Sequence, residues 1–160
     1  MTYTSRLDLS DHVRKQACGL LQARLSDAID LEAQAKQAHW NVKGPRFLQL
    51  HELFDRLHGE IEDFVDLLAE RITALGHVAD GRIATTAANS TLYGYPLEAT
   101  GGEAHLKALA GSLGAFGKEA REAINQASLA GDADTADLFT QISRETDKQL
   151  WFLEAHLQAH

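Results

Sequence analysis

The strongest constraint on the fold is a helical repeat of apolar side chains across residues 46–75. Apolar residues recur there at intervals of three and four, which places them on one face of a helix. The same spacing returns in residues 10–41, in residues 100–130 and from residues 132–134 to the end of the chain. Because Ala, Leu, Glu, Gln and Arg are frequent and proline occurs only twice, the composition also favours helix over sheet. The sequence therefore predicts an all-α protein with four long helices.

The breaks between these segments predict how the helices are connected. The stretch VKGP ends the first helix, Gly76 the second and Gly131 the third, and the first and third links are short. Short links make antiparallel neighbours, whereas the second link, residues 77–99, is long enough to cross the whole bundle. A four-helix bundle with one long crossover is the ferritin-like arrangement. We also predict a short helix inside the crossover, at residues 89–94, and a capping box from Thr100 and Glu103 at the third helix.

Length and charge restrict the class of protein further. A chain of 160 residues fits a single domain, residues 1–160, with residues 1–9 as a short N-terminal tail. Its formal net charge of -8 suits cations better than nucleic acid. The one cysteine, Cys18, excludes an intrachain disulfide, and no stretch has the pattern of a signal peptide or a membrane span. We therefore expect a cytoplasmic protein.

Two pairs of metal-ligand residue types lie on the second predicted helix. His51 and Asp55 are four residues apart, as are Asp66 and Glu70, and all four share roughly one stripe. At a rise of ~1.5 Å per residue, however, Asp55 and Asp66 are about 16 Å apart. No single metal centre spans that distance within one helix. A solvated polar face is the alternative interpretation of the stripe.

A two-fold axis would bring the two pairs together. If a second copy of the helix crosses antiparallel near Gly59, the His51 end of one chain faces the Glu70 end of the other. His39, at the end of the first helix, lies beside His51 in the antiparallel pair. Each of the two sites then has two imidazoles and three carboxylates, which suits iron or another first-row divalent ion.

The stretches KQAHWNVKGPRFLQLHELFD and DLLAERITALG resemble the Dps family, the mini-ferritins named for DNA protection during starvation. The resemblance covers essentially the whole chain and includes GDADTADLFTQISRETDKQLWFLEAHL at its end. It implies a hollow dodecamer with ferroxidase centres at two-fold interfaces. One subunit would supply His39, His51 and Asp55, and its partner Asp66 and Glu70, with Glu70 as the main anchor.

The resemblance also implies the reaction. Members oxidise Fe(II), with hydrogen peroxide preferred over oxygen, and store a ferric mineral inside the cage, which protects against oxidative damage. Trp40 and Trp151 would lie near the centre and donate electrons to stray oxidant; the alternative is that both belong to the core. Zinc or manganese could compete for the same ligands.

Several further residues have two interpretations each. Asp132 and Asp137 either line an acidic three-fold pore, as the resemblance suggests, or cap and complement the last helix. Glu52 either nucleates mineral in the cavity or is a surface residue. His58 either forms an extra metal site with Glu62 of a partner or is a hydrogen-bonded interface histidine. His105 is expected at the surface.

A DNA-compacting structural protein with little ferroxidase activity is the alternative function. Family members that compact DNA often use a mobile tail rich in Lys and Arg. Here residues 1–15 hold Arg6, Arg14 and Lys15 against Asp8 and Asp11, and the C-terminal AHLQAH has no Lys or Arg. We therefore expect weak or no DNA binding, no membrane partner and a homo-oligomer.

Overall fold

The computed structural model describes residues 2–158 and contains five helices. These are α1 (Asp11–Asn41), α2 (Phe47–Ala74), α3 (Ile83–Asn89), α4 (Gly102–Ala130) and α5 (Ala133–Ala155). Within this range there is no β-strand, only two isolated bridges. The predicted all-α class and the four long helices are confirmed. No helix in residues 2–158 is long and apolar enough to cross a bilayer.

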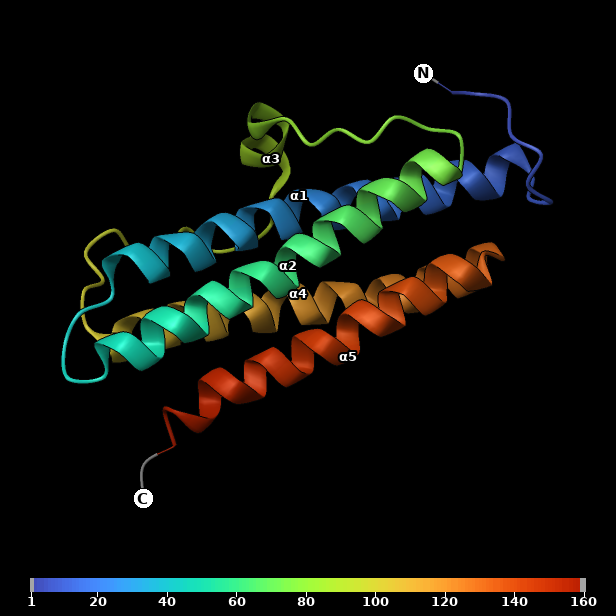
Figure 1. Cartoon of the computed structure of the whole chain (residues 1–160). Coiled ribbons are helices and arrows are strands. Elements are labelled where there is room, and N and C mark those ends of the chain that lie inside the picture. The colour runs from blue at the N-terminus through green and yellow to red at the C-terminus, as the bar shows by residue number, and fades with distance from the viewer. Residues whose placement is uncertain (1, 159–160) are drawn as a thin grey trace.

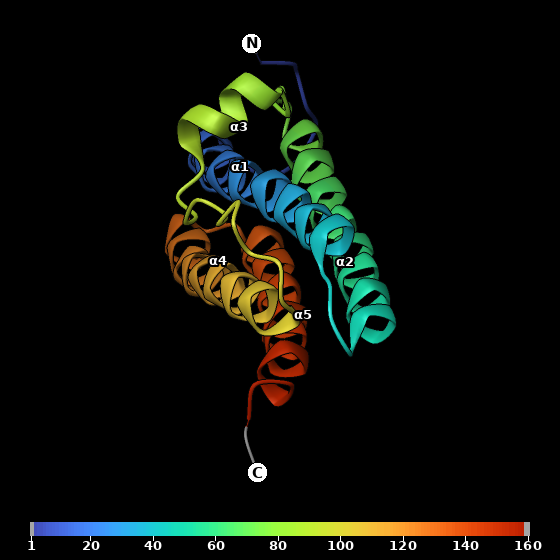
Figure 2. The same cartoon turned by 90° about the vertical axis from the view of Figure 1, so that its left-hand side faces the viewer.

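The four long helices form two packed pairs. α1 packs mainly on α2, and α4 on α5, with α1 also contacting α4 (Figure 1). Viewed along the bundle, the pairs lie face to face and α3 covers the outside of α1 (Figure 2). The residues between them are apolar and fully buried, and the largest include Phe54, Phe116, Phe139, Leu21 and Leu68. Burying one such side chain contributes about 1.5–3 kcal/mol, so this interface holds the pairs together.

The turn between α1 and α2 follows the predicted chemistry. The amide of Val42 donates to the carbonyl of Ala38 and ends α1, and Gly44 has a φ of 113°. A positive φ of this kind is accessible to glycine at little cost. The amide of Phe47 then donates to the Gly44 carbonyl as α2 begins. The turn therefore places the last turn of α1 beside the first turns of α2.

The long crossover is confirmed, but the short helix in it was predicted at the wrong place. α3 occupies Ile83–Asn89 rather than residues 89–94. The following residues are held extended by two carboxylates of α1: the Thr91 amide donates to Asp27 at 2.7 Å, and the Ser90 hydroxyl donates to Asp30 at 2.5 Å. Tertiary hydrogen bonds therefore decide the conformation of this polar segment.

The crossover returns the chain to the α1–α2 turn before α4 begins. The Lys43 amide donates to the Thr100 carbonyl at 2.9 Å, and a β-carbon added at Gly102 would lie 2.4 Å from Leu50 Cδ1. The predicted capping box is wrong, because α4 starts from Gly101 without a side-chain cap and Glu103 pairs with Lys107 instead. The first turn of α4 therefore lies against the beginning of α2.

One glycine inside α4 has a packing reason. A β-carbon at Gly117 would lie 3.3 Å from Thr146 Cγ2, so α5 approaches α4 closely at this point. Gly111 and Gly114 have no such neighbour within 4 Å. Close helix approach therefore explains one of these three glycines.

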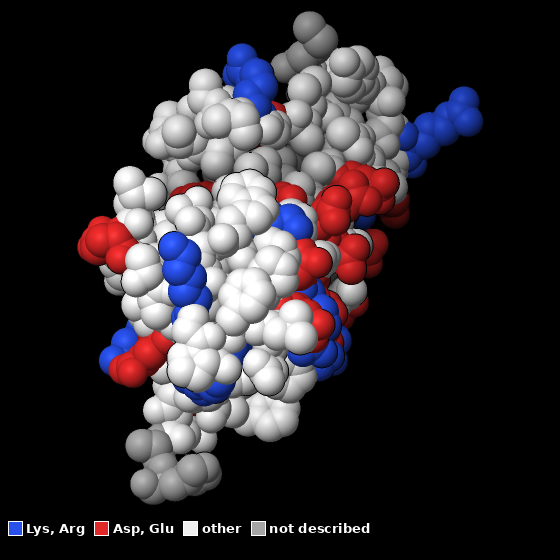
Figure 3. All heavy atoms as spheres, turned by 60° about the vertical axis from the view of Figure 1, so that its left-hand side comes forward, with Lys and Arg blue, Asp and Glu red and all other residues white. Residues whose placement is uncertain are grey.

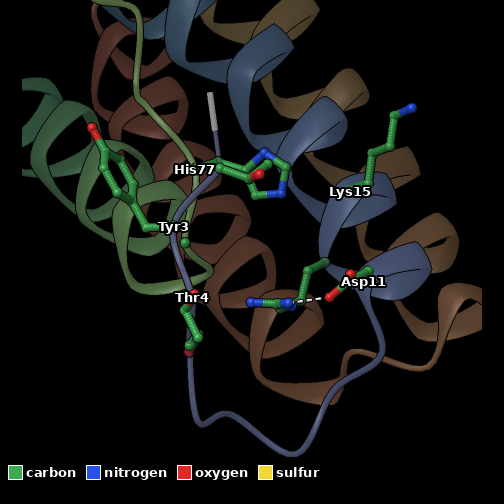
Figure 4. Close-up of a pocket in the computed structure, with 9 residues that line it drawn as sticks. Tyr3, Thr4, Asp11, Lys15 and His77 are labelled. Carbon is green, nitrogen blue, oxygen red and sulfur yellow. Dashed lines mark hydrogen bonds and ion pairs between the residues drawn. The ribbon is translucent and has the colours of Figure 1, made fainter.

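The N-terminal tail lies along the far end of the bundle. The Tyr3 amide donates to the Gly76 carbonyl at 2.7 Å, and Thr2 pairs with His77. Beneath the tail is a hollow of about 460 Å³ that Tyr3, Asp11 and His77 help to line (Figure 4), and Asp11 forms an ion pair with Arg14 on the first turn of α1. This hollow is at the start of α1, about 42 Å from His39 at a rise of ~1.5 Å per residue.

Candidate metal centre

Two histidines stack where α1 ends and α2 begins. The ring centroids of His39 and His51 lie 3.7 Å apart with an interplanar angle of 23°. Each ring bonds to the backbone of the other residue: His39 Nδ1 lies 2.8 Å from the His51 carbonyl oxygen, and His51 Nδ1 lies 2.8 Å from the His39 carbonyl oxygen. The reciprocal bonds fix both rings and tie the two helices together.

These backbone bonds also fix the tautomers of both rings. A carbonyl oxygen can only accept, so each Nδ1 must carry the hydrogen and donate it. In the neutral imidazole the lone pair is then on Nε2, which is the form that binds a metal ion. A ring held through its other nitrogen is the usual arrangement of metal-ligating histidine. Both rings therefore have the orientation and the tautomer that metal-ligating histidines use.

Asp55 supplies a carboxylate beside the stacked rings. Its Oδ1 lies 3.9 Å from His39 Nδ1 and accepts a hydrogen bond from Lys36 Nζ at 2.5 Å. The bond from Lys36 is the main cause that lowers the pKa of Asp55 below its ordinary value. Asp55 is thus held ionised, and Lys36 occupies an oxygen that a metal ion would use.

The structure places Asp66 and Glu70 far along α2 from the histidines. Both residues are exposed, and neither side chain makes a hydrogen bond or ion pair within residues 2–158. Eleven residues at a rise of ~1.5 Å separate Asp55 and Asp66 by about 16 Å along one straight helix. Among the described residues of a single chain, no group of three or more His, Cys, Asp or Glu side chains could hold a metal ion. Within one chain the candidate ligands therefore form two separate half-sets, one with His39, His51 and Asp55 and the other with Asp66 and Glu70.

The two tryptophans are at the surface of the chain. Trp40 is 67% exposed and Trp151 is 60% exposed, so neither belongs to the core of the bundle, contrary to the core alternative. Trp40 follows His39 directly on the last turn of α1, and Phe47 and Leu48 nearby are also exposed. Exposed apolar side chains gathered beside the histidines, here Trp40, Phe47 and Leu48, are typical of a surface that another protein chain covers.

The sequence left two interpretations open for Glu52, His58, Glu62 and Asp137, which lie on α2 and α5. Glu52, Glu62 and Asp137 are exposed and form no ion pair in the described part of the chain. His58 Nδ1 lies 3.6 Å from Glu32 Oε1 of the same chain, and burial raises the pKa of Glu32 while His58 opposes this. Within one chain, His58 therefore faces a carboxylate of α1.

Asp132 is almost fully buried and has several partners. Both of its oxygens accept from Arg71, at 2.8 and 3.1 Å, and it caps α5 through the Thr135 amide at 3.0 Å. The Thr135 hydroxyl donates to it as well, at 2.6 Å. These contacts are those of a structural N-cap.

Sequence reasoning overlooked four residues around the site. Lys36 and Glu32 precede His39 by three and seven residues, so both lie on the α1 face that meets α2, a spacing that could have identified them. The prediction that His105 lies at the surface is wrong, because its side chain is fully buried. Its Nδ1 lies 2.5 Å from the hydroxyl of Tyr95. No spacing in the sequence relates Tyr95 on the crossover to His105 on α4.

Comparisons with known proteins agree with this architecture. A family model described as the ferritin-like domain matches residues 18–159. The DNA protection during starvation protein of Agrobacterium fabrum is 40% identical over 157 residues, covering 98% of this chain and 97% of the relative.

Solved structures of Dps proteins superpose closely. Mycobacterium smegmatis Dps has a TM-score of 0.93 at 32% identity and covers 99% of this chain and 96% of its own. DpsC from Streptomyces coelicolor has a TM-score of 0.95 at 28% identity and covers 100% of this chain and 94% of its own. With this bundle, its crossover and near-complete coverage, the chain belongs to the Dps family of ferritin-like proteins.

Proposed function

We propose that this protein is a ferroxidase and iron store that oxidises Fe(II) with hydrogen peroxide or oxygen at centres shared by two chains. The observation that carries the proposal is the division of the candidate ligands between two separate places along α2. One half-set holds His51 of α2 and His39 of α1 with both Nε2 atoms available, and the other holds Asp66 and Glu70, whose side chains have no partner among residues 2–158. An antiparallel second copy of α2 would join the two halves and form two sites by symmetry.

The ligands suit oxidation of iron. Carboxylate oxygens are hard ligands, which favour Fe(III) over Fe(II), while the two imidazoles suit either state. Two Fe(II) ions side by side give up one electron each, and hydrogen peroxide accepts both and becomes two hydroxides. Paired delivery avoids a hydroxyl radical, which is the protective part of the function. Zinc and manganese would compete for the same set.

Assembly is part of this function. The uncovered apolar residues beside His39 and the divided ligands both require a partner chain, and the family supports a hollow dodecamer in which the ferric product is stored. Since neither half holds a metal ion well alone, metal binding and association stabilise one another.

Because each proposed site is divided between two chains, mixing two inactive variants tests the proposal. His39→Ala and Glu70→Ala are each expected to abolish rapid formation of ferric product from Fe(II) and peroxide, whereas Glu122→Gln, an exposed carboxylate of α4, leaves the rate unchanged. When the two inactive variants are unfolded together and reassembled, half of the dimers are mixed, and each has one intact site out of two. Activity should therefore return to about a quarter of the wild-type level.

A centre contained in one chain predicts the opposite result, because every chain in the mixture lacks one ligand. No recovery in assemblies shown to be mixed would overturn the two-chain site. Full activity of both single variants would overturn the ligand assignment itself.

We further propose that DNA binding is weak or absent near neutral pH. On the face shown in Figure 3, Lys and Arg side chains are scattered singly, and Asp and Glu side chains gather along one side. This face therefore offers no continuous basic surface for phosphates, and the net charge of -8 also disfavours DNA. Retention of DNA in a gel-shift at physiological salt would favour the DNA-compacting alternative.

A further inference from the structure

A hydrogen-bonded tyrosine–histidine pair joins the crossover to the start of α4. The Tyr95 hydroxyl and His105 Nδ1 are 2.5 Å apart, and the His105 side chain is fully buried. Burial lowers the pKa of His105 and raises the pKa of Tyr95 above its ordinary value. Both groups are therefore neutral at pH 7, so the phenol donates its hydrogen to Nδ1.

This tautomer places the ring hydrogen of His105 on Nε2. Among the described residues no acceptor meets normal hydrogen-bond geometry to Nε2, and the backbone of Asn41 is the polar group that interacts with the ring. The backbone of Asn41 is close enough to favour the charged imidazole, which would stabilise His105 if it received a proton.

Two contacts of His105, with the backbone of Asn41 and with the ring of Phe54, relate the pair to the candidate centre. Asn41 is the last residue of α1 and follows His39 by two positions. The ring of Phe54, which precedes Asp55 on α2, lies 6.2 Å from the His105 ring between centroids. His105 therefore packs against the turn of α2 that carries Asp55 and against the end of α1 that carries His39.

Tyr95 also lines an open hollow at the surface of the chain. Tyr95, Tyr93, Pro96, Lys107 and Gly111 line an open space of about 420 Å³ together with neighbouring residues. Tyr95 is partly buried and His105 is not accessible. A small reductant in solution can thus approach the tyrosine from outside while the proton acceptor stays shielded from water.

We propose that Tyr95, with His105 as its proton acceptor, donates one electron to the iron centre when peroxide meets a single Fe(II). This inference rests on the proposed ferroxidase function. One Fe(II) supplies one electron and becomes Fe(III), and Tyr95 supplies the second. The phenol proton moves to His105 Nδ1 as its electron leaves, which gives a neutral tyrosyl radical and an imidazolium. Hydrogen peroxide takes both electrons and becomes two hydroxides, so atoms and charge balance.

The short hydrogen bond between Tyr95 and His105 allows the electron and the proton to leave the phenol together. A phenol that loses an electron becomes a strong acid, and without a base in contact the charged radical is costly in an apolar site. A proton acceptor within about 2.6–3.2 Å removes that cost. His105 returns the proton when a one-electron reductant in solution, such as a thiol, approaches through the hollow and gives one electron to the Tyr95 radical.

The test is electron paramagnetic resonance after rapid freezing. Assembled protein, loaded with less than one Fe(II) per site, is mixed with peroxide, and parallel samples contain ring-deuterated tyrosine or ring-deuterated tryptophan. We expect a neutral tyrosyl signal that narrows only with deuterated tyrosine. It should be lost in Tyr95→Phe and persist in Tyr93→Phe, which alters the exposed tyrosine two residues away on the same segment.

His105→Gln separates hydrogen bonding from proton acceptance. The amide oxygen of glutamine can accept the phenol hydrogen bond but cannot take the proton, so the signal should fall at least tenfold although the chain stays folded. Circular dichroism and the assembly state confirm folding of each variant. Ferric product without a tyrosyl signal, or a signal unchanged in Tyr95→Phe, overturns this inference and leaves the ferroxidase function standing. Absence of ferric product in the wild type overturns the ferroxidase function instead.

Discussion

Replacement of Asp132 by alanine separates a structural role for this carboxylate from a role in a pore. In the structure Asp132 is 2% exposed, accepts two bonds from Arg71 and caps α5 through Thr135. Loss of an N-cap costs about 1 kcal/mol. A buried cation without its partner adds a penalty of about 3–5 kcal/mol, reduced because Arg71 is 16% exposed and can reach water. We expect Asp132→Ala to lower the free energy of unfolding by about 3–5 kcal/mol.

Two control variants show how much unfolding free energy an exposed carboxylate contributes. Asp147 also forms a two-bond ion pair, with Arg121 at 2.7 and 3.0 Å, but both partners are about half exposed. Asp147→Ala should therefore cost only about 0–1 kcal/mol. Asp137→Ala, at an exposed position of α5 without an ion pair in residues 2–158, should change stability by no more than about 0.5 kcal/mol.

Thermal unfolding at one fixed protein concentration measures the difference, since association raises the apparent stability of all variants. For a chain of this size about 2–4 °C of Tm corresponds to 1 kcal/mol, so Asp132→Ala should lose roughly 6–20 °C and the controls less than about 4 °C. If Asp132→Ala keeps its Tm and only slows iron uptake, the structural reasoning is wrong and the pore interpretation holds.

Three further predictions concern Cys18, Lys36 and His105. Burial raises the pKa of Cys18 to about 11, so alkylation of the native thiol at pH 7 should be at least a hundredfold slower than in urea, and equal rates would contradict its burial. Lys36→Gln should tighten Zn(II) binding by roughly tenfold in calorimetry of the assembled protein, because no ammonium then competes at Asp55; weaker binding would count against the site. Burial lowers the pKa of His105 below 6.5, so the unfolded chain takes up its proton first and stability falls as the pH drops below 6.5. Urea unfolding from pH 7.5 to 5 should show this loss in the wild type and less of it in His105→Gln; identical slopes would exclude the contribution.

The periodic apolar positions made the four long helices predictable. Leu50, Phe54, Leu57, Ile61 and Leu68 follow the helical repeat, and all are buried as expected. The repeat predicts helices because one face of each helix must be buried away from water. The residues that form this face are close together in the sequence. Short links and one long link then left few ways to connect the helices.

Polar segments without such a repeat were not predictable. The crossover after α3 is extended because Asp27 and Asp30 of α1 bond to it, and the start of α4 is fixed by contact with the α1–α2 turn. These partners are about 60 residues away in sequence, so local propensity has no information about them. For the same reason the burial of His105 was not predictable, because it depends on Tyr95 of the crossover, which covers it.

The sequence by itself determined the helices, their order and the types of the candidate ligands, because helical spacing places residues four apart on one face. Only the tertiary structure decided which ring nitrogens of His39 and His51 remain available, that Lys36 reaches Asp55, that Asp132 is a buried cap and that Tyr95 meets His105. Each of these depends on a hydrogen bond between distant segments. Such bonds exist only after the apolar faces have packed, because packing alone sets the distances that a directional bond requires.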